Sequence, residues 1–185
     1  MDRHPKLSIV LATKNRACYL DRFFRNMEQQ MLGCGCPAEL IVIDGASTDG
    51  AIEIIRRYEH LISFWVSEPD TGVSEAVNKG LARARGEIIK LVGDEDLFYE
   101  GAFKKGVAYL DEHPQCDCVI FHSNWLFEIE NGKHYQFKLT EPSGQITFET
   151  LLQLIFIKLP QPEAAFFRSK PLQAFLYADG RRVGI

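Results

Sequence analysis

Acidic side chains gather immediately after an apolar run in the middle of the chain. Asp94, Glu95 and Asp96 follow residues 88–92, a pattern typical of a buried strand and the loop behind it. An Asp-x-Asp pair offers the hard oxygen ligands that Mg²⁺ and Mn²⁺ prefer, and such ions usually bridge to substrate phosphates. Turn residues and helix caps are the alternative interpretation of acids at a loop start. Because adjacent carboxylates repel one another, a cation beside the cluster is favoured over an unpartnered cluster.

Polar residues also follow three other apolar runs, at residues 7–12, 40–43 and 64–66. In open α/β sheets, ligands bind outside the carboxyl ends of the strands. The sequence therefore predicts one site at that edge of a sheet. For Asp44 and Asp49 the interpretation as turn residues stays open beside the functional one. The residues in question are Thr13, Lys14, Asn15, Arg16, Asp44, Glu68, Asp70 and the acidic cluster.

The segments between these runs have helical spacing, and Ser47, Thr48 and Asp49 offer N-caps to the second helix. Alternation of strand and helix as far as residue 121 predicts an α/β fold with a mainly parallel sheet and helices on both faces. Residues 125–130 and 134–139 flank Asn131-Gly132 and predict a hairpin. The expected inner faces of the helices are Leu20, Phe23, Phe24, Met27 and Met31, then Ile52, Ile55 and Tyr58, then Val73, Ala76, Val77, Gly80, Leu81 and Ala84, then Phe103, Val107 and Leu110.

Composition excludes several classes of protein. A net charge of -4 with both signs interspersed argues against a nucleic-acid partner. The start of the chain has no apolar signal core, and no apolar run reaches the ~18 residues of a membrane span. These features predict a cytoplasmic protein. The sequence also lacks the Gly-x-Gly-x-x-Gly of dinucleotide-binding enzymes, a Walker loop, and the Asp that ends the first strand of phospho-aspartyl phosphatases.

Five cysteines are present, and an odd number without a signal peptide argues against a disulfide framework. The pairs Cys34/Cys36 and Cys116/Cys118 suggest a four-thiolate zinc site. The predicted fold opposes that site, because the two strands that follow the pairs should lie several positions apart in the sheet. Free thiols are the favoured interpretation.

Four blocks of sequence, in their order and spacing over residues 7–125, resemble family 2 glycosyltransferases. Pro160-Gln161-Pro162 with Phe166-Phe167-Arg168 resembles a later, weaker block. The four blocks are residues 8–16 (SIVLATKNR), residues 39–50 (ELIVIDGASTDG), residues 67–73 with 78–80 and 84–87 (SEPDTGV, NKG, ARGE), and residues 93–96 (GDED).

This resemblance implies a GT-A fold, a nucleotide-diphosphate sugar donor, a UDP-sugar first among them, and inversion at the anomeric carbon. Residues 1–121 would be the nucleotide-sugar-binding half of a single domain, 1–185, and residues 122–185 a partial acceptor half. By position, Ala12, Thr13 and Lys14 would border the base, and Asp44 would accept a hydrogen bond from it. Asp94 and Asp96 would hold Mn²⁺ or Mg²⁺ with the diphosphate, and Glu95 would lie beside them. Asn15, Arg16 and Asp70 complete the expected donor site, and Lys79 is either a phosphate contact or a solvated helix lysine.

The resemblance departs from the family pattern at the end of the chain. An inverting transferase needs a base for the acceptor hydroxyl, and only Asp179 stands late enough to serve. We therefore expect a truncated chain, with a catalytically inactive nucleotide-sugar-binding remnant as the alternative function. A nucleotidyltransferase ranks last, because no Gly-rich, Arg-bearing loop follows the first strand.

The acceptor would be a saccharide or a lipid-linked saccharide. Residues 151–159, LLQLIFIKL, would form a helix packed on the sheet. Two other interpretations remain open. The segment would face a lipid carrier at the inner face of the membrane, or it would be exposed and support a homodimer.

Overall fold

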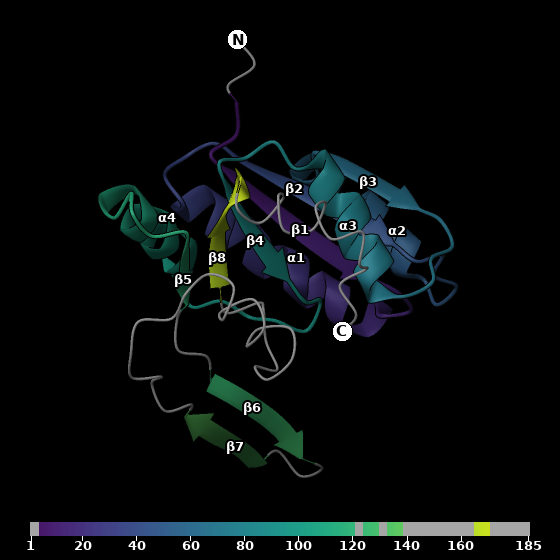
Figure 1. Ribbon diagram of the computed structural model, residues 1–185. Coiled ribbons are helices and arrows are strands. Elements are labelled where there is room, and N and C mark those ends of the chain that lie inside the picture. The colour runs from purple at the N-terminus through teal and green to yellow at the C-terminus, as the bar shows by residue number, and fades with distance from the viewer. Residues whose placement is uncertain (1–3, 121–123, 130–132, 139–164, 171–185) are drawn as a thin grey trace.

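The computed structural model of the chain describes residues 4–120, 124–129, 133–138 and 165–170. Strands and helices alternate through most of them (Figure 1). The elements are β1 (Leu7–Thr13), α1 (Ala17–Gly33), β2 (Ala38–Asp44), α2 (Ala51–Arg57), the 3-10 helix η1 (Glu59–Leu61), β3 (Phe64–Ser67), α3 (Val73–Arg83), β4 (Ile88–Val92), α4 (Ala102–Glu112), β5 (Cys118–Ile120), β6 (Asn124–Ile129), β7 (Lys133–Lys138) and β8 (Ala165–Arg168).

Six strands form one sheet in the order β3-β2-β1-β4-β8-β5. β1 pairs in parallel with β2 and β4, and β2 pairs in parallel with β3. The predicted mainly parallel sheet is therefore confirmed. β8 is antiparallel to both β4 and β5, and the sequence had not predicted it as a strand. It occupies the position between β4 and β5, where Phe167 lies opposite Ile89 and Phe166 lies opposite Val119.

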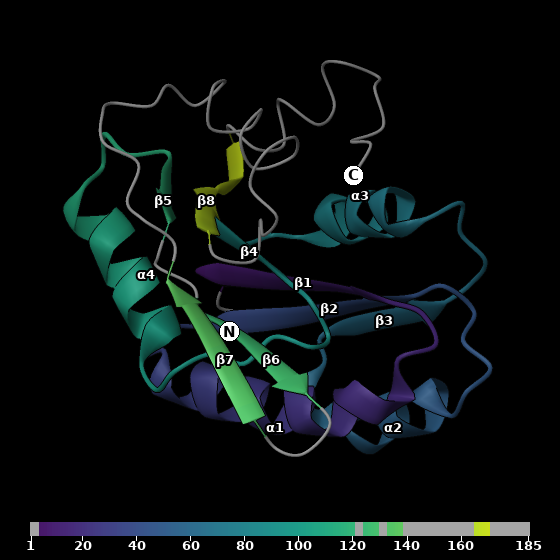
Figure 2. The same cartoon turned by 90° about the horizontal axis from the view of Figure 1, so that it is seen from below.

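Helices cover both faces of the sheet, as predicted (Figure 2). Alternate residues of β1 point to opposite faces, because side chains of a strand have a period of two. Leu7, Ile9 and Leu11 pack in the core beneath α1, α2 and α4. Val10 belongs to the second core, beneath α3.

The predicted inner face of α1 is largely confirmed, since Leu20, Phe23, Phe24 and Met27 are fully buried. Four expected inner-face residues, Met31, Ile52, Val73 and Val77, are not fully buried. Met31 is only partly buried, and Gln30 is buried in the same helix. In α2, Ile54 rather than Ile52 packs against the core. Val73 is 49% exposed, because it is the first residue of α3 and precedes the part that packs on the sheet.

A buried carboxylate clamps the amino edge of the sheet. Glu39, at 4% exposure, accepts hydrogen bonds from Ser8 Oγ at 2.6 Å, from the Arg85 backbone N–H at 2.7 Å and from the Arg85 guanidinium at 3.0 and 3.1 Å. Ser8 Oγ in turn accepts from the backbone N–H of Gly86 at 2.7 Å. The clamp therefore joins β1, β2 and the turn before β4 through groups that all find partners.

The cysteine pairs lie far apart in the sheet. β2 follows Cys34 and Cys36, and β1, β4 and β8 separate it from β5, which begins at Cys118. The expected separation is confirmed, and all five thiols are free. Cys34 Sγ lies 3.1 Å from Cys36 Sγ, and burial raises the pKa of the Cys34 thiol to about 12.

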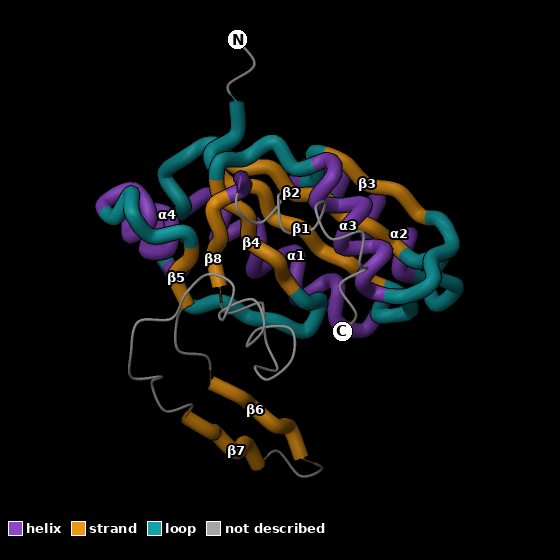
Figure 3. Tube along the Cα trace, viewed as in Figure 1, coloured by secondary structure: helices purple, strands orange, loops and turns teal. Residues whose placement is uncertain are grey.

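The predicted hairpin is confirmed as an antiparallel pair of β6 and β7, in which Trp125 lies opposite Phe137 (Figure 3). Its Asn131-Gly132 turn lies outside the described residues, and so do residues 151–159 and Asp179. Among the described residues, no helix combines the length and apolarity that a bilayer crossing requires.

Gly86 provides a test of the clamp. A Cβ at Gly86 would lie 2.6 Å from the backbone N of Ser8, whereas a Cβ at Gly33 would meet nothing within 4 Å. We expect Gly86→Ala to lower the free energy of unfolding by about 1–3 kcal/mol, since backbone must move. The same substitution at Gly33, the last helical residue of α1, should leave stability unchanged or raise it by up to about 1 kcal/mol. Urea unfolding of both variants is the measurement, and equal effects would contradict the close approach.

Candidate functional site

Polar side chains form a row along the carboxyl edge of four neighbouring strands. Asp44, the last residue of β2, lies between Thr13 of β1 and Ser67 of β3 in the parallel register. Leu11 of β1 lies opposite Val92 of β4, which places Asp94 beside Thr13. Thr13 Oγ1 donates a hydrogen bond to Asp94 Oδ2 at 2.7 Å. The register therefore brings the polar residues at the ends of all four strands to one edge.

Asp44 is completely buried in this row. Its Oδ2 accepts from the backbone N–H of Ser47 at 2.9 Å and from Ser67 Oγ at 2.6 Å, and its Oδ1 accepts from Ser47 Oγ. Three of the roughly four acceptor positions of a carboxylate are thus used inside the protein. In this structure Asp44 shapes the loop after β2, and a base that contacts it directly must first open that loop.

The loops after β1 and β2 are joined by reciprocal hydrogen bonds. Asn15, with a left-handed φ of 53°, donates its backbone N–H to Ser47 Oγ at 2.7 Å, and its Oδ1 accepts from Thr48 N at 2.8 Å. Asp49 accepts from Ala17 N at 2.8 Å and from Ala51 N at 3.1 Å. The N-cap of α2 is Gly50, so the predicted N-caps were wrong. Asp49 still accepts from the first residue of α2 and from the first residue of α1.

Gly45 marks the point where two expected donor residues converge. A Cβ at this position would lie 2.5 Å from Asp70 Oδ2 and 2.9 Å from Lys14 Cδ. Lys14 is exposed and Asp70 is half-buried, and Asp70 Oδ1 accepts from Gly72 N at 3.0 Å. Lys14 and Asp70 therefore flank the loop that Asp44 shapes, at the end of the row formed by β1, β2 and β3.

Lys79 lies in an acidic setting at this end of the row. Its ammonium is 2.8 Å from Glu68 and 3.0 Å from Glu75, and both neighbours raise its pKa. Hydrogen bonds from Thr71 and Lys79 lower the pKa of Glu75 to about 2. Lys79 thus links α3 to the loop after β3.

The acidic cluster lies at the other end of the row. Asp94 is 7% exposed and Asp96 is half-buried, and burial raises the pKa of each above its ordinary value. The hydrogen bond from Thr13 opposes that shift for Asp94, and one from Gly93 N, at 2.8 Å, opposes it for Asp96. Two carboxylates are therefore held where their charge is poorly solvated, an arrangement typical of functional sites.

Arg16 lies beside this cluster, where the sequence predicted a divalent metal ion. Its Nη2 lies 2.9 Å from Glu95 Oε2, and its Nε lies 3.6 Å from Asp94 Oδ1. The sequence had placed Arg16 in the donor site but had not paired it with the acids. The pairing arises because the loop after β1 and the loop after β4 leave adjacent strands at the same edge.

Sequence reasoning missed three residues that support the acidic loop. The side-chain amides of Asn26 and Gln30 in α1 form hydrogen bonds of 2.8–3.4 Å with the backbone of Phe98, Tyr99 and Phe103, and so hold this segment against the helix. Lys90 of β4 is 1% exposed and lowers the pKa of Asp96. In the sequence, Asn26 and Gln30 could have been recognised as amides within the amphipathic segment that forms α1, and Lys90 as a lysine inside an apolar strand.

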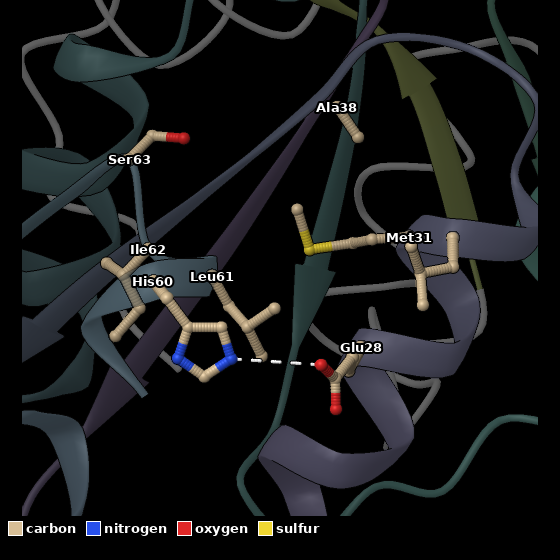
Figure 4. A pocket seen from close by; sticks show the side chains of 8 residues that line it. Glu28, Met31, Ala38, His60, Leu61, Ile62 and Ser63 are labelled. Atoms are coloured by element: carbon tan, nitrogen blue, oxygen red, sulfur yellow. Dashed lines mark ion pairs between the residues drawn. The ribbon is translucent and has the colours of Figure 1, made fainter. Parts of the chain in front are cut away.

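A hollow of ≈ 320 Å³ lies at the opposite edge of the sheet (Figure 4). Ala38, at the start of β2, and Ser63, just before β3, line it together with the end of α1. His60 Nε2 lies 3.7 Å from Glu28 Oε1 across its mouth. None of the residues expected in the donor site lines this hollow, so it is separate from the polar row.

The family model for glycosyl transferase family 2 matches residues 8–175. An uncharacterized glycosyltransferase of Haemophilus influenzae is 30% identical over 156 residues, which make up 80% of this chain and 58% of that protein. The poly(ribitol-phosphate) beta-N-acetylglucosaminyltransferase TarS of Staphylococcus aureus is 27% identical over 111 residues, or 58% of this chain and 19% of that protein.

Two solved structures have folds similar to that of this chain. The Pyrobaculum calidifontis mannosyltransferase PcManGT, in complex with GDP-Man and Mn²⁺, has a TM-score of 0.55 at 26% identity and covers 64% of this chain and 36% of its own. Staphylococcus aureus TarS has a TM-score of 0.65 at 19% identity, with 92% of this chain and 48% of its own covered. This chain thus spans less than two thirds of each of these relatives.

The Thr13 hydrogen bond to Asp94 gives a direct test of the row. We expect Thr13→Val to lower the free energy of unfolding by about 1.5–3 kcal/mol, because it leaves a buried carboxylate short of a donor. Thr13→Ser keeps the hydroxyl and should lose only the burial of one methyl group, about 0.8 kcal/mol. Chemical denaturation at neutral pH compares the two. A valine variant as stable as the serine variant would show that the hydroxyl does not matter.

Proposed function

This chain belongs to glycosyl transferase family 2, and from that premise we propose that it binds a nucleotide-diphosphate sugar along the row Ser67, Asp44, Thr13 and Asp94 and transfers the sugar to an acceptor hydroxyl. The observation that carries the proposal is the row itself. It places the hydrogen-bonded carboxylate Asp44, flanked by Lys14 and Asp70, at the β2–β3 end and the acidic cluster at β4, on adjacent strands. A nucleotide has a hydrogen-bonding base and ribose at one end and an anionic diphosphate at the other, and the diphosphate would pair with the acids through a divalent cation.

The base and ribose belong at the β2–β3 end. Ala12 is half-buried and Lys14 is exposed there, whereas the Thr13 side chain is buried and bonded to Asp94. We assign Lys14 and Asp70 to direct contact with the nucleoside, because both flank Gly45 at the surface. Asp44 acts there chiefly by fixing the loop, through Ser47 and Ser67. Asn15 holds the adjoining loop in place.

A divalent cation fits the acidic end. Asp94 and Asp96 supply hard carboxylate oxygens, and no group of three or more metal-binding side chains exists among the residues that the structure describes. Mn²⁺ and Mg²⁺ are commonly held by one or two carboxylates together with substrate phosphates, so two ligands suffice. The Mn²⁺ and GDP-Man reported for PcManGT support the same pairing of metal and donor. Such an ion would neutralise the charge that develops on the leaving diphosphate.

The transfer step is proposed as an inverting displacement. The acceptor oxygen forms a bond to the anomeric carbon as the bond from that carbon to the diphosphate oxygen breaks, and a base removes the hydroxyl proton. Asp179 is our candidate for the base, and it lies outside the described residues. Arg16 is a cation at the acidic end of the row, and Lys14 and Lys79 are cations at its other end.

Metal dependence is the first test of this function. We expect UDP or GDP to bind more tightly in Mn²⁺ than in EDTA, by a factor on the order of ten, or about 1.4 kcal/mol. Asp96→Ala should remove the metal-dependent part and keep the weaker binding seen in EDTA. Titration calorimetry with both nucleotides measures this, and release of labelled sugar from UDP-GlcNAc or GDP-mannose shows whether transfer chemistry accompanies binding. Equal affinity in the two buffers would remove the metal role.

Asp44 is tested separately from the metal. We expect Asp44→Ala to weaken nucleotide binding by about 1.5–3 kcal/mol, because the loop loses hydrogen bonds to a charged group. The ratio of affinities in Mn²⁺ and EDTA should stay as in the wild type. Ser67→Ala removes only one of the three donors and should have a smaller effect. If the alanine variant folds and binds nucleotides as the wild type does, Asp44 has no part in the donor site.

A further inference from the structure

The guanidinium of Arg16 lies beside the Asp94 oxygen that a metal ion would need. Asp94 has one oxygen bonded to Thr13, and the other, Oδ1, is the oxygen that Arg16 Nε approaches at 3.6 Å. That distance is an ion pair without a hydrogen bond. Glu95, the second partner of Arg16, is 57% exposed, and exposed pairs of this kind are weak. Arg16 therefore neutralises the cluster through contacts that exchange easily.

The backbone at Arg16 is fixed while its side chain is not enclosed. Asn15 is bonded to the loop after β2, and Ala17 N donates to Asp49. The Arg16 side chain is 44% exposed, and its guanidinium lies 5.2 Å from the centroid of the Tyr19 ring. The side chain can thus rotate about a fixed base, with the Tyr19 ring beside it and the acids at the end of its reach.

We infer that Arg16 is an exchangeable counter-ion, which pairs with Asp94 and Glu95 in the donor-free enzyme and moves to the diphosphate when the metal–nucleotide complex binds. This inference rests on the proposed function. A divalent ion at Asp94 Oδ1 repels the guanidinium, and the diphosphate offers it oxygen atoms that suit its planar fork. The metal alone would therefore displace Arg16 from Asp94 and leave it only the exposed Glu95, whereas the metal with a nucleotide would provide a new partner.

Two effects of opposite sign follow from this exchange. Removing the guanidinium should make the acids bind Mn²⁺ more tightly, because a competing cation is gone. It should make the same protein bind UDP or GDP more weakly in the presence of Mn²⁺, because a diphosphate contact is gone. The mutual enhancement between metal and nucleotide should shrink by the same factor whichever ligand is added first, since coupling between sites is reciprocal.

The experiment compares Arg16→Gln with wild type, Arg16→Lys and Arg25→Gln. Free Mn²⁺ is followed by electron paramagnetic resonance without nucleotide, and UDP and GDP binding by calorimetry with and without Mn²⁺. We expect Arg16→Gln to bind Mn²⁺ roughly fivefold or more tightly and the nucleotides roughly fivefold or more weakly, the lower end of typical coupling. Arg16→Lys should fall between, because it keeps the charge and loses the fork. Arg25→Gln, on the helix α1 that begins after Arg16 and paired with Asp21, should match the wild type.

The outcomes separate this inference from the function on which it rests. If Arg16→Gln binds Mn²⁺ no more tightly than the wild type, while nucleotide binding stays metal-dependent, the counter-ion role is wrong and the proposed donor site stands. If the wild type binds no Mn²⁺ and its nucleotide affinity is equal in EDTA, both the metal role and the exchange are overturned. Tighter Mn²⁺ binding with unchanged nucleotide binding would also overturn the exchange, since Arg16 would then only repel the metal.

Discussion

Parallel pairing of β1 with both β2 and β4 is the constraint on which the rest of the structure depends. Because parallel strands in aligned register end at the same edge, Asp44, Thr13 and Asp94 become neighbours although they are far apart in the sequence. A shift of one residue in either ladder would turn the polar end residue to the other face of the sheet. Glu39 and Ser8 hold this register at the amino edge, where their hydrogen bonds also fix the turn that leads into β4.

The two edges of the sheet handle buried charge in different ways. At the amino edge, Glu39 is matched by permanent partners from β1 and the turn before β4. At the carboxyl edge, burial raises the pKa of Asp94 and Asp96, and Arg16 is a loosely held partner. A folded protein gains nothing in stability from poorly solvated acids whose cation is replaceable. That arrangement makes sense at a place where a charged ligand binds, which is why the carboxyl edge carries the proposed donor site.

Rigidity of the acidic loop comes from a helix at some distance in the sequence. The amides of Asn26 and Gln30 satisfy the backbone of residues 98–103, so that the segment between β4 and α4 is held against α1 without a regular strand. The same helix begins beside Arg16, where its first residue donates a hydrogen bond to Asp49 of the loop after β2. α1 therefore connects both ends of the polar row, and a change in its packing would affect the proposed nucleotide and metal contacts together.

The sequence by itself determined the α/β class, the strands β1 to β5, the hairpin, and the edge of the sheet to which the polar residues belong. These features depend on local patterns: apolar runs, helical spacing, and polar residues at the point where a strand ends. Other features were decided only by tertiary structure, because they join segments whose local patterns carry no mark of the partner. β8 pairs with both β4 and β5, Asp44 is enclosed by Ser47 of the loop after β2 and Ser67 of β3, and Arg16 meets Asp94 across two adjacent strands. Hydrogen-bonding capacity and charge are properties of single residues, but which groups satisfy each other depends on the register and order of the strands.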